Sequence, residues 1–264
     1  MTFPDDYLNK VLCGDCLEVM KGIPDKSVDL VLTDPPYGLT QNEWDTKYIK
    51  KHTDLPILMR ELFRCCRGNV IITSQQPFTT ILINSAPTNF KYDIIWDKVI
   101  PTGFLNANKM PLRSHEIICV FGSGVYNPQK TFGEKNHTRG NGNNAKNNCY
   151  GEFERDNGAD DLGNHKHPKS IIEFEKPHPS TTEHPTQKPV ALFDWIIKTY
   201  SNDGHRILDP FLGSGTTAIA CLRTGRHFIG IEKHEPYFIK AQERIDKERE
   251  QVRLFGATGD GVFA

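Results

Sequence analysis

The chain has 264 residues, of which 37% are hydrophobic and 25% are charged, a composition typical of a globular protein with an apolar core. Its length fits one large domain, or one domain with a small inserted lobe. The formal net charge of −1 argues against binding of nucleic acid by overall charge, although an enzyme could still contact nucleic acid through one local patch.

Short apolar runs alternate with segments of helical spacing along the chain. This alternation predicts an α/β fold whose mostly parallel sheet has about seven strands with helices between them. The predicted strands, in chain order, are 10–13, 27–32, 69–73, 92–96, 116–121, 206–209 and 227–232. The predicted helices are 15–21, 55–66, one that begins at Pro77, 192–200, 217–224 and 237–252.

A polar stretch interrupts this pattern. Residues 133–164 are rich in Gly, Asn, His and charge, so they can bury little apolar surface, and we expect an inserted loop or lobe there. Order returns at 171–174. The predicted organisation is a first half of the sheet domain at 9–121, an inserted polar segment at 122–180, a second half at 181–252 and a tail at 253–264.

The first motif that can carry chemistry is Asp34-Pro35-Pro36-Tyr37. It follows the apolar strand 27–32, and open α/β sheets bind ligands outside the carboxyl ends of their strands. The two prolines hold the turn rigid. The Asp34 carboxylate and a proline carbonyl are two acceptors for the two hydrogens of an exocyclic amino group, and Tyr37 can stack on a flat base. The alternative is an ordinary strand-to-loop turn, because Asp-Pro is common in turns.

The second motif is a Gly-rich turn between the predicted strand 206–209 and the helix 217–224. Glycines let the backbone approach a ligand closely, and a threonine can cap the helix. Glu232 follows this turn at the end of the next strand, the usual place for an acid that binds ribose hydroxyls. Ala218 replaces the third glycine of the dinucleotide fingerprint, but the turn and Glu232 together predict a cofactor site. The turn residues assigned to it are Asp209, Phe211, Gly213, Ser214, Gly215 and Thr216.

The third motif, His184-Pro185-Thr186-Gln187-Lys188-Pro189, leads into the predicted helix 192–200. Thr186 and Lys188 offer hydrogen-bond donors that suit a carboxylate ligand. The alternative is a turn that caps the helix.

Together the three motifs resemble those of amino-group DNA methyltransferases, and the position of Asp34-Pro35-Pro36-Tyr37 before the Gly-rich turn resembles the β class of that family. The resemblance covers about residues 9–252, and the segment 102–116 also resembles compact members that phages or prophages often carry. It implies a circularly permuted, Rossmann-like, seven-stranded methyltransferase sheet with helices on both faces. The polar segment 122–180 would then be a small target-recognition lobe, between a catalytic half and a cofactor-binding half.

The resemblance also implies S-adenosylmethionine as the cofactor and double-stranded DNA as the substrate. Asp34, Pro35, Pro36 and Tyr37 correspond to the catalytic turn that holds the target base. The residues that correspond to a cofactor site are Asp15 at the adenine, Glu232 at the ribose, Phe211, Gly213 and Gly215 at the methionine end, Thr186 and Lys188 near the carboxylate, and Asp34, Asp209, Ser214 and Thr216.

We therefore expect site-specific methyl transfer to the N6 amino group of an adenine flipped out of duplex DNA. The lone pair of this nitrogen is delocalised into the ring, and the Asp34 carboxylate and Pro35 carbonyl would orient it for attack without a metal. Transfer to the N4 of cytosine is the alternative within the class, and Asp rather than Ser before Pro-Pro-Tyr favours adenine. An enzyme of RNA or protein amides would fit Asn at position 34 better. A non-catalytic DNA-binding subunit would be expected to lose residues such as Asp34 or Glu232.

DNA contacts are predicted in and beside the polar segment. The candidates for phosphate or base contacts are Lys109, Arg113, Lys130, Arg139 and Lys146, each of which could instead be a solvated surface charge. Trp44 follows the catalytic turn and could close over the flipped base, fill its place in the stack, or simply pack under its loop. The pair Cys13 and Cys16 lacks a second pair at zinc-binding spacing, and no metal is predicted.

The cellular setting is inferred from features that the sequence lacks. No run of about 18 apolar residues occurs, which argues against a membrane span, and residues 1–6 lack the basic and apolar parts of a secretory signal. Seven cysteines, with Cys65 and Cys66 adjacent, argue against a disulfide framework. We therefore expect a cytoplasmic protein. The apolar helices beside 69–84, and the frequent pairing of members of the β class, lead us to expect a homodimer.

Overall fold

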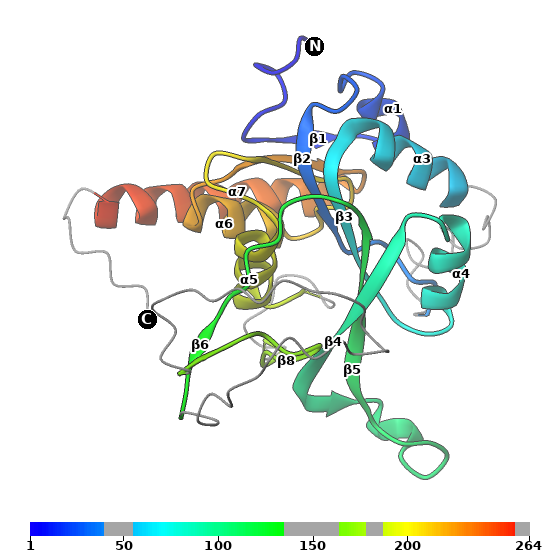
Figure 1. The fold of residues 1–264 in the computed structure, drawn as a ribbon. Helices are drawn as coiled ribbons and strands as arrows, with labels where there is room; N and C mark the ends of the chain where they lie inside the picture. Colours follow the sequence, from blue (N-terminus) through cyan, green and yellow to red (C-terminus); the bar gives the residue numbers. More distant parts are fainter. Residues whose placement is uncertain (40–54, 135–163, 178–186, 257–264) are drawn as a thin grey trace, which may run out of the picture. The chain divides into compact units, whose positions relative to one another are not determined.

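The computed structural model describes residues 1–39, 55–134, 164–177 and 187–256 (Figure 1). The chain divides into two compact units, one formed by Met1–Asn127 with Ser170–Ala264 and the other by Pro128–Lys169. Within the described residues, no helix is long and apolar enough to cross a membrane.

The second unit contains two short strands, β6 (Thr131–Phe132) and β7 (His165–Lys166), which pair in antiparallel fashion. The Phe132 ring packs edge-on against His165, with centroids 5.8 Å apart. The predicted insertion, 122–180, includes this unit and a few residues of the first unit on either side of it.

The first unit is built on one eight-stranded sheet. From edge to edge its strands are β1 (Lys10–Cys13), β10 (His227–Glu232), β9 (Arg206–Asp209), β2 (Val28–Thr33), β3 (Cys66–Ser74), β5 (Arg113–Gly122), β4 (Phe90–Thr102) and β8 (Ile171–Glu173). The strands from β1 to β3 are parallel, β5 is antiparallel to both of its neighbours, and β8 is parallel to β4. Seven of these are the predicted strands, and β8 is an additional edge strand that forms where the polar segment ends.

The strand order confirms the circular permutation, because the C-terminal strands β9 and β10 lie between the N-terminal strands β1 and β2. From β9 the chain continues to β10 on one side, whereas from β2 it continues to β3 on the other. The direction of winding therefore reverses between β9 and β2, and ligands of open α/β sheets bind outside the carboxyl ends of the strands at such a point. The fold thus places the candidate site where β9 ends at Asp209 and β2 ends at Thr33.

Helices cover both faces of the sheet, as predicted (Figure 1). On one face are α1 (Cys16–Met20), α3 (Leu55–Cys65) and α4 (Phe78–Ser85), and on the other α5 (Val190–Tyr200), α6 (Thr216–Arg223) and α7 (Glu235–Gly256). Side chains of a strand alternate between faces, so in β2 Val31 joins the first core while Leu30 and Leu32 join the second. Every residue of β2 is buried, which agrees with its largely apolar sequence.

Local signals set where the helices beside the site begin. The Asp15 carboxylate caps α1 by accepting the backbone N–H of Leu17 at 3.0 Å. Gly215 precedes α6 with a φ of 85°, a left-handed value that favours glycine. Helix α5 begins after Pro189, where a missing N–H costs the first turn nothing.

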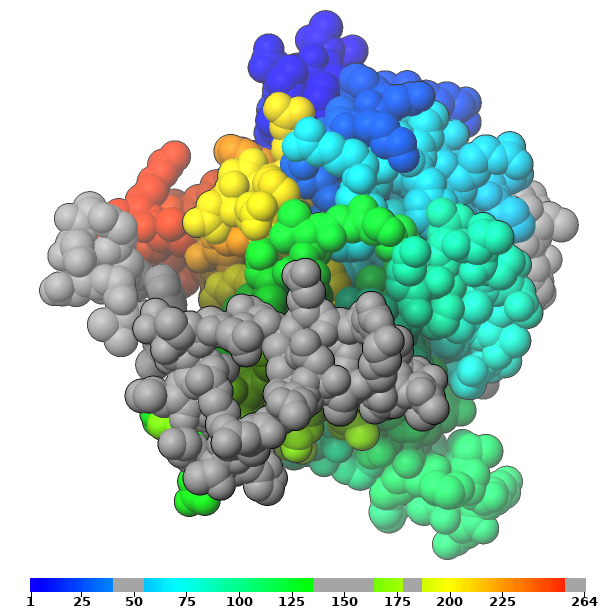
Figure 2. Space-filling view, in the orientation of Figure 1, coloured from blue at the N-terminus to red at the C-terminus, as the bar shows by residue number. Residues whose placement is uncertain are grey.

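Beyond the sheet, β4 and β5 continue into a hairpin, here named the β4–β5 arm (residues 99–113). A single 3-10 turn, Phe104–Asn106, lies at its tip. Phe104 and Leu105 expose 81% and 97% of their surface. Figures 1 and 2 show the arm, in green, projecting away from the sheet. Its apolar side chains therefore add little to the core.

Candidate active site

The ends of β9 and β2 are joined by the side chain of Asp209. One carboxylate oxygen accepts hydrogen bonds from the Thr33 hydroxyl at 2.7 Å and the Phe211 backbone N–H at 3.0 Å, and the other accepts from the Thr217 hydroxyl at 2.5 Å. Only 3% of Asp209 is exposed, and burial raises the pKa of its carboxyl to about 7, although these hydrogen bonds oppose the shift. Asp209 therefore links the Gly-rich turn to β2 and to α6 through hydrogen bonds.

The Gly-rich turn is held close to Glu232 at the end of β10. The backbone N–H of Gly213 donates to one Glu232 oxygen at 2.9 Å, and that of His234 donates to the other at 2.7 Å. The turn also depends on Gly230, because a Cβ there would lie 2.5 Å from the Leu212 side chain. Burial raises the pKa of Glu232, against the pull of these backbone donors. Each oxygen keeps acceptor capacity for a ligand hydroxyl.

Asp15 lies beside Glu232 because β1 and β10 are neighbours. Cys13 pairs with Glu232 in the sheet register, and the backbone N–H of Gly14 donates to the Glu232 carbonyl at 3.0 Å. The second oxygen of Asp15 forms an ion pair with Lys233 at 3.0 Å. The ends of these two strands therefore present two carboxylates next to the Gly-rich turn.

Asp34 follows β2 directly, and its carboxylate receives three donors. One oxygen accepts from the Tyr37 hydroxyl at 2.6 Å and the Thr73 hydroxyl at 2.5 Å, while the other lies 2.8 Å from the Lys188 ammonium. The Tyr37 ring stacks on Phe78, with centroids 5.4 Å apart and 22° between the planes, so a planar ligand could stack only on its remaining face. The Asp34 side chain is 21% exposed, which leaves it open to a ligand.

Lys188 connects Asp34 to a second carboxylate, that of Glu116. The Lys188 ammonium lies 3.1 Å from one Glu116 oxygen, and the Lys98 ammonium lies 3.7 Å from the other. Burial alone would lower the pKa of Lys188, but attraction to Asp34 and Glu116 outweighs it and the pKa is raised. For Lys98, burial outweighs the attraction to Glu116 and the pKa is lowered. Lys188 is thus a cation fixed between two carboxylates.

Glu116, Lys98 and Thr73 are site residues that no sequence motif indicates. Each lies within a strand, and the sheet brings the three strands β3, β5 and β4 side by side. One feature of the sequence could have indicated Glu116, because this carboxylate directly precedes the apolar run 117–121. A charged residue in that position has to find a partner or reach solvent.

The structure brings the predicted site residues together in two groups. The catalytic group is Asp34, Pro35, Pro36, Tyr37 and Lys188, and the cofactor group is Asp15, Asp209, Phe211, Gly213, Gly215 and Glu232. The Lys188 ammonium, expected near the cofactor carboxylate, contacts Asp34 and Glu116. The hydroxyls of Ser214 and Thr216 each lie 3.3 Å from the Arg244 guanidinium. The contacts of all these residues with a cofactor or a base stay predictions.

The remaining candidates are distributed more widely. Lys109 and Arg113 are exposed on the β4–β5 arm, and Lys130 is exposed in the second unit. Thr186 and the DNA-contact candidates Trp44, Arg139 and Lys146 lie outside the described residues. Among the residues that the structure describes, no group of three or more His, Cys, Asp or Glu side chains could hold a metal ion, and the six cysteines are free thiols.

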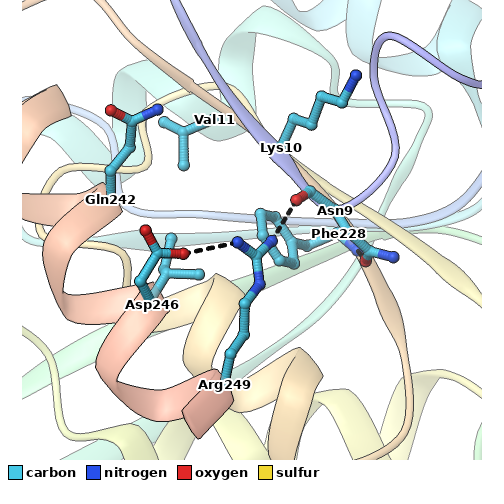
Figure 3. Close-up of a pocket in the computed structure, with 8 residues that line it drawn as sticks. Asn9, Lys10, Val11, Phe228, Gln242, Asp246 and Arg249 are labelled. Atoms are coloured by element: carbon cyan, nitrogen blue, oxygen red, sulfur yellow. Dashed lines mark hydrogen bonds and ion pairs between the residues drawn. The ribbon is translucent and has the colours of Figure 1, made fainter.

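A hollow of about 170 Å³ lies at the opposite end of the strands, between α7 and the start of β1 (Figure 3). The Arg249 guanidinium donates to the Asn9 carbonyl at 2.5 Å and pairs with Asp246 at 2.8 Å. It also lies 5.9 Å from the ring centroid of Phe228, at the amino end of β10. The Arg249 guanidinium thus has partners within the hollow, and the hollow is separate from the candidate active site.

Comparisons with known proteins agree with this geometry. The model of the DNA methylase family N6_N4_Mtase matches residues 28–243. The type II methyltransferase M.BglII of Bacillus subtilis is 28% identical over 289 aligned residues, covering 96% of this chain and 73% of the relative. The solved M1.HpyAVI–SAM complex has a TM-score of 0.61 at 24% identity, over 90% of this chain and 98% of that one. The cytosine-N4-specific PvuII DNA methyltransferase has a TM-score of 0.61 at 14% identity, over 92% of each chain.

The match to the family model runs from the strand before Asp34, through Lys188 and the Gly-rich turn, to beyond Glu232. The chain therefore belongs to the DNA methylase family. The two solved structures confirm the predicted fold class, a methyltransferase sheet with helices on both faces.

Proposed function

We propose that this protein is a site-specific DNA methyltransferase that transfers a methyl group to the N6 amino group of adenine in duplex DNA. The observation that carries the proposal is the position of Asp34. Its carboxylate stands at the switch point of the sheet, fixed by Tyr37 and Thr73 and still partly exposed, on the edge that also holds Glu232 and the Gly-rich turn.

The cofactor is S-adenosylmethionine, which supplies a methyl group made electrophilic by its sulfonium sulfur. Glu232 would accept hydrogen bonds from the ribose hydroxyls, since each of its oxygens has one backbone donor and spare acceptor capacity. Asp15 would meet the adenine. Phe211, Gly213 and Gly215 would line the methionine end, where the glycine backbone allows close approach.

The residues of the catalytic turn orient the target amine. The Asp34 carboxylate and the Pro35 carbonyl accept its two N–H bonds, so that the nitrogen lone pair is directed away from both acceptors. Tyr37 and Thr73 hold one Asp34 oxygen in place before the base arrives, so little reorganisation accompanies the reaction. The base has to leave the duplex to reach this turn, at a cost of a few kcal/mol, and stacking on Tyr37 would return about 1–3 kcal/mol.

We propose adenine rather than cytosine as the target base because Asp, rather than Ser, precedes Pro-Pro-Tyr in this chain. The alternative is transfer to the N4 of cytosine, since a cytosine-N4-specific enzyme has the same fold. A non-catalytic DNA-binding subunit is disfavoured because Asp34, Tyr37 and Glu232 are all present and engaged.

The β4–β5 arm is proposed to contact the DNA. No acidic residue occurs from 98 to 115, while Lys109 and Arg113 are exposed and suited to phosphate. Phe104 and Leu105 are apolar, exposed and near the tip, so they could pack against bases of the duplex. Lys130, Arg139, Lys146 and Trp44 remain further candidates.

A homodimer is proposed as well, because α3 and α4 present exposed or half-buried apolar side chains such as Ile57 and Ile81. Light scattering at micromolar concentration measures the mass directly. A fully active particle of 30.0 kDa would contradict the dimer.

The function is tested by incubating the purified chain with S-adenosylmethionine that carries a labelled methyl group and with unmethylated duplex DNA, RNA of the same sequence, or protein. We expect label in the duplex, and much less with Asp34→Asn. Label in RNA or protein but not in DNA would contradict the proposal.

A further inference from the structure

The site contains a chain of alternating charges, of which the sequence motifs supply only Asp34 and Lys188. Asp34, Lys188, Glu116 and Lys98 follow one another at 2.8, 3.1 and 3.7 Å. Their side chains are 21%, 7%, 15% and 3% exposed, so water screens these charges weakly. The four formal charges sum to zero, and the chain connects Asp34, on the proposed base pocket, to the root of the β4–β5 arm.

The two ends of this chain have different surroundings. Asp34 also binds the Tyr37 and Thr73 hydroxyls, which fix one of its oxygens. Lys98 also donates to the Thr102 hydroxyl at 3.1 Å, inside β4. Glu116 therefore stands between a lysine held by the fold and a lysine that touches Asp34.

The position of Lys188 matters because the target amine becomes positively charged as it is methylated. The negative charge of Asp34 favours that change, whereas the ammonium of Lys188, 2.8 Å from Asp34, opposes it. If Glu116 lost its charge, the attraction that holds Lys188 on its far side would vanish. Lys188 would then pair with Asp34 alone and neutralise the charge of that carboxylate more fully.

We propose that Glu116 is a positioning residue of the methyl transfer, which acts through Lys188. It shares the ammonium of Lys188 with Asp34, so that the second Asp34 oxygen is only partly neutralised and keeps negative charge and acceptor capacity for the amine. This inference rests on the proposed function, because it assigns a role within the same reaction.

The test is a double-mutant cycle on the single-turnover rate, with cofactor and duplex DNA both saturating. We expect Glu116→Gln to lower the rate about 10- to 100-fold, a part of the effect typical of a lost preorganised charge. Dissociation constants for the cofactor and DNA should change less than about 3-fold. In a Lys188→Gln background the same substitution should have almost no further effect, because the cation through which it acts is gone.

Glu173→Gln, an exposed substitution on β8, which pairs with β4, is the matched control and should leave the rate unchanged. A purely structural role for Glu116 would give equal losses in both backgrounds and a lower melting temperature that tracks the loss. Equal losses, or a loss confined to DNA binding, would overturn the proposal.

A second measurement separates this inference from the function itself. In protein labelled with ¹⁵N at the lysine ammonium groups, the Lys188 signal should be protected from exchange and should shift or broaden in Glu116→Gln but not in Glu173→Gln. An unaltered Lys188 signal would overturn the sharing of Lys188. A wild-type chain that shows this sharing but transfers no methyl group would instead contradict the proposed function, and with it the role of Glu116 in the reaction.

Discussion

Asp34→Asn is the substitution whose consequences the structure defines most fully. Asn keeps the shape of the side chain and one oxygen that can accept from Tyr37 and Thr73, which donate at 2.6 and 2.5 Å. The amide NH2 then takes the place of the oxygen 2.8 Å from Lys188, so two donors face each other. The target amine loses a charged acceptor and meets a donor instead.

The expected loss of rate depends on whether the Asp34 carboxylate stabilises the transition state more than the bound base. Positive charge develops on the amine during transfer, so the carboxylate stabilises the transition state more than the bound base, and the effect should fall on kcat. Removal of one preorganised partner of this kind typically costs about 100- to 1000-fold in rate. Breaking a buried ion pair typically lowers the free energy of unfolding by about 3–5 kcal/mol. The loss in Asp34→Asn should be smaller, because Lys188 still pairs with Glu116 at 3.1 Å.

The assay is single-turnover transfer of labelled methyl to duplex DNA, with cofactor affinity measured by calorimetry on the same preparation. We expect the rate to fall by the stated factor and cofactor affinity to change little, since the contacts of Gly213 and Glu232 are untouched. A variant that kept more than about a tenth of the rate would refute the two-acceptor mechanism. A variant that also lost cofactor binding would show that Asp34 supports the fold rather than the base pocket.

Three further outcomes are expected. Glu232→Gln should weaken cofactor binding by about 1–3 kcal/mol through lost charge-assisted hydrogen bonds, and undiminished transfer at cofactor concentrations far below saturation would count against its ribose role. Phe104→Ser combined with Leu105→Ser should weaken DNA binding while the melting temperature stays unchanged, because both side chains are exposed; normal DNA affinity and rate would remove the arm from the interface. The pKa of Asp209 is raised from 3.8 to about 7 in the folded protein, so the unfolded chain releases this proton first and stability should fall as pH rises from about 4 to about 7, by at most about 1.4 kcal/mol per pH unit. Thermal melts should then show wild type losing stability relative to Asp209→Asn across that window, with no further change above it, and a constant difference would contradict the raised pKa.

Much of the sheet follows from local sequence because its central strands are buried on both faces. The predicted bounds of the inner strands β9 and β10 coincide with those in the structure, because short apolar runs there are bounded by polar residues, and those of the edge strand β1 coincide as well. In contrast, β4 and β5 are longer than their apolar cores, since pairing across the hairpin extends them into the exposed β4–β5 arm. The short strand β8 exists through its pairing with β4, a contact distant in sequence that periodicity does not encode.

The residues of the candidate site also divide into those that local sequence predicts and those that depend on contacts distant in sequence. Asp34, the Gly-rich turn and Glu232 can be predicted because each stands at the end of a recognisable strand or next to a glycine with a special backbone angle. Glu116 and Lys98 cannot, because their importance arises from the lateral pairing of β4 with β5 and from the approach of Lys188. The motif of Lys188 predicts a place near the cofactor carboxylate, whereas in the structure its ammonium contacts Asp34 and Glu116, two carboxylates that are distant from it in sequence.

The central claim is tested most directly by identifying the modified nucleoside. Unmethylated duplex DNA is treated with the purified chain and S-adenosylmethionine, digested to nucleosides and analysed by chromatography with mass detection, alongside the same reaction with Asp34→Asn. We expect N6-methyl-2′-deoxyadenosine from the wild-type reaction and at most a small fraction of it from the variant. N4-methyl-2′-deoxycytidine in its place would contradict the choice of base, and the absence of any methylated nucleoside would contradict the proposed enzyme.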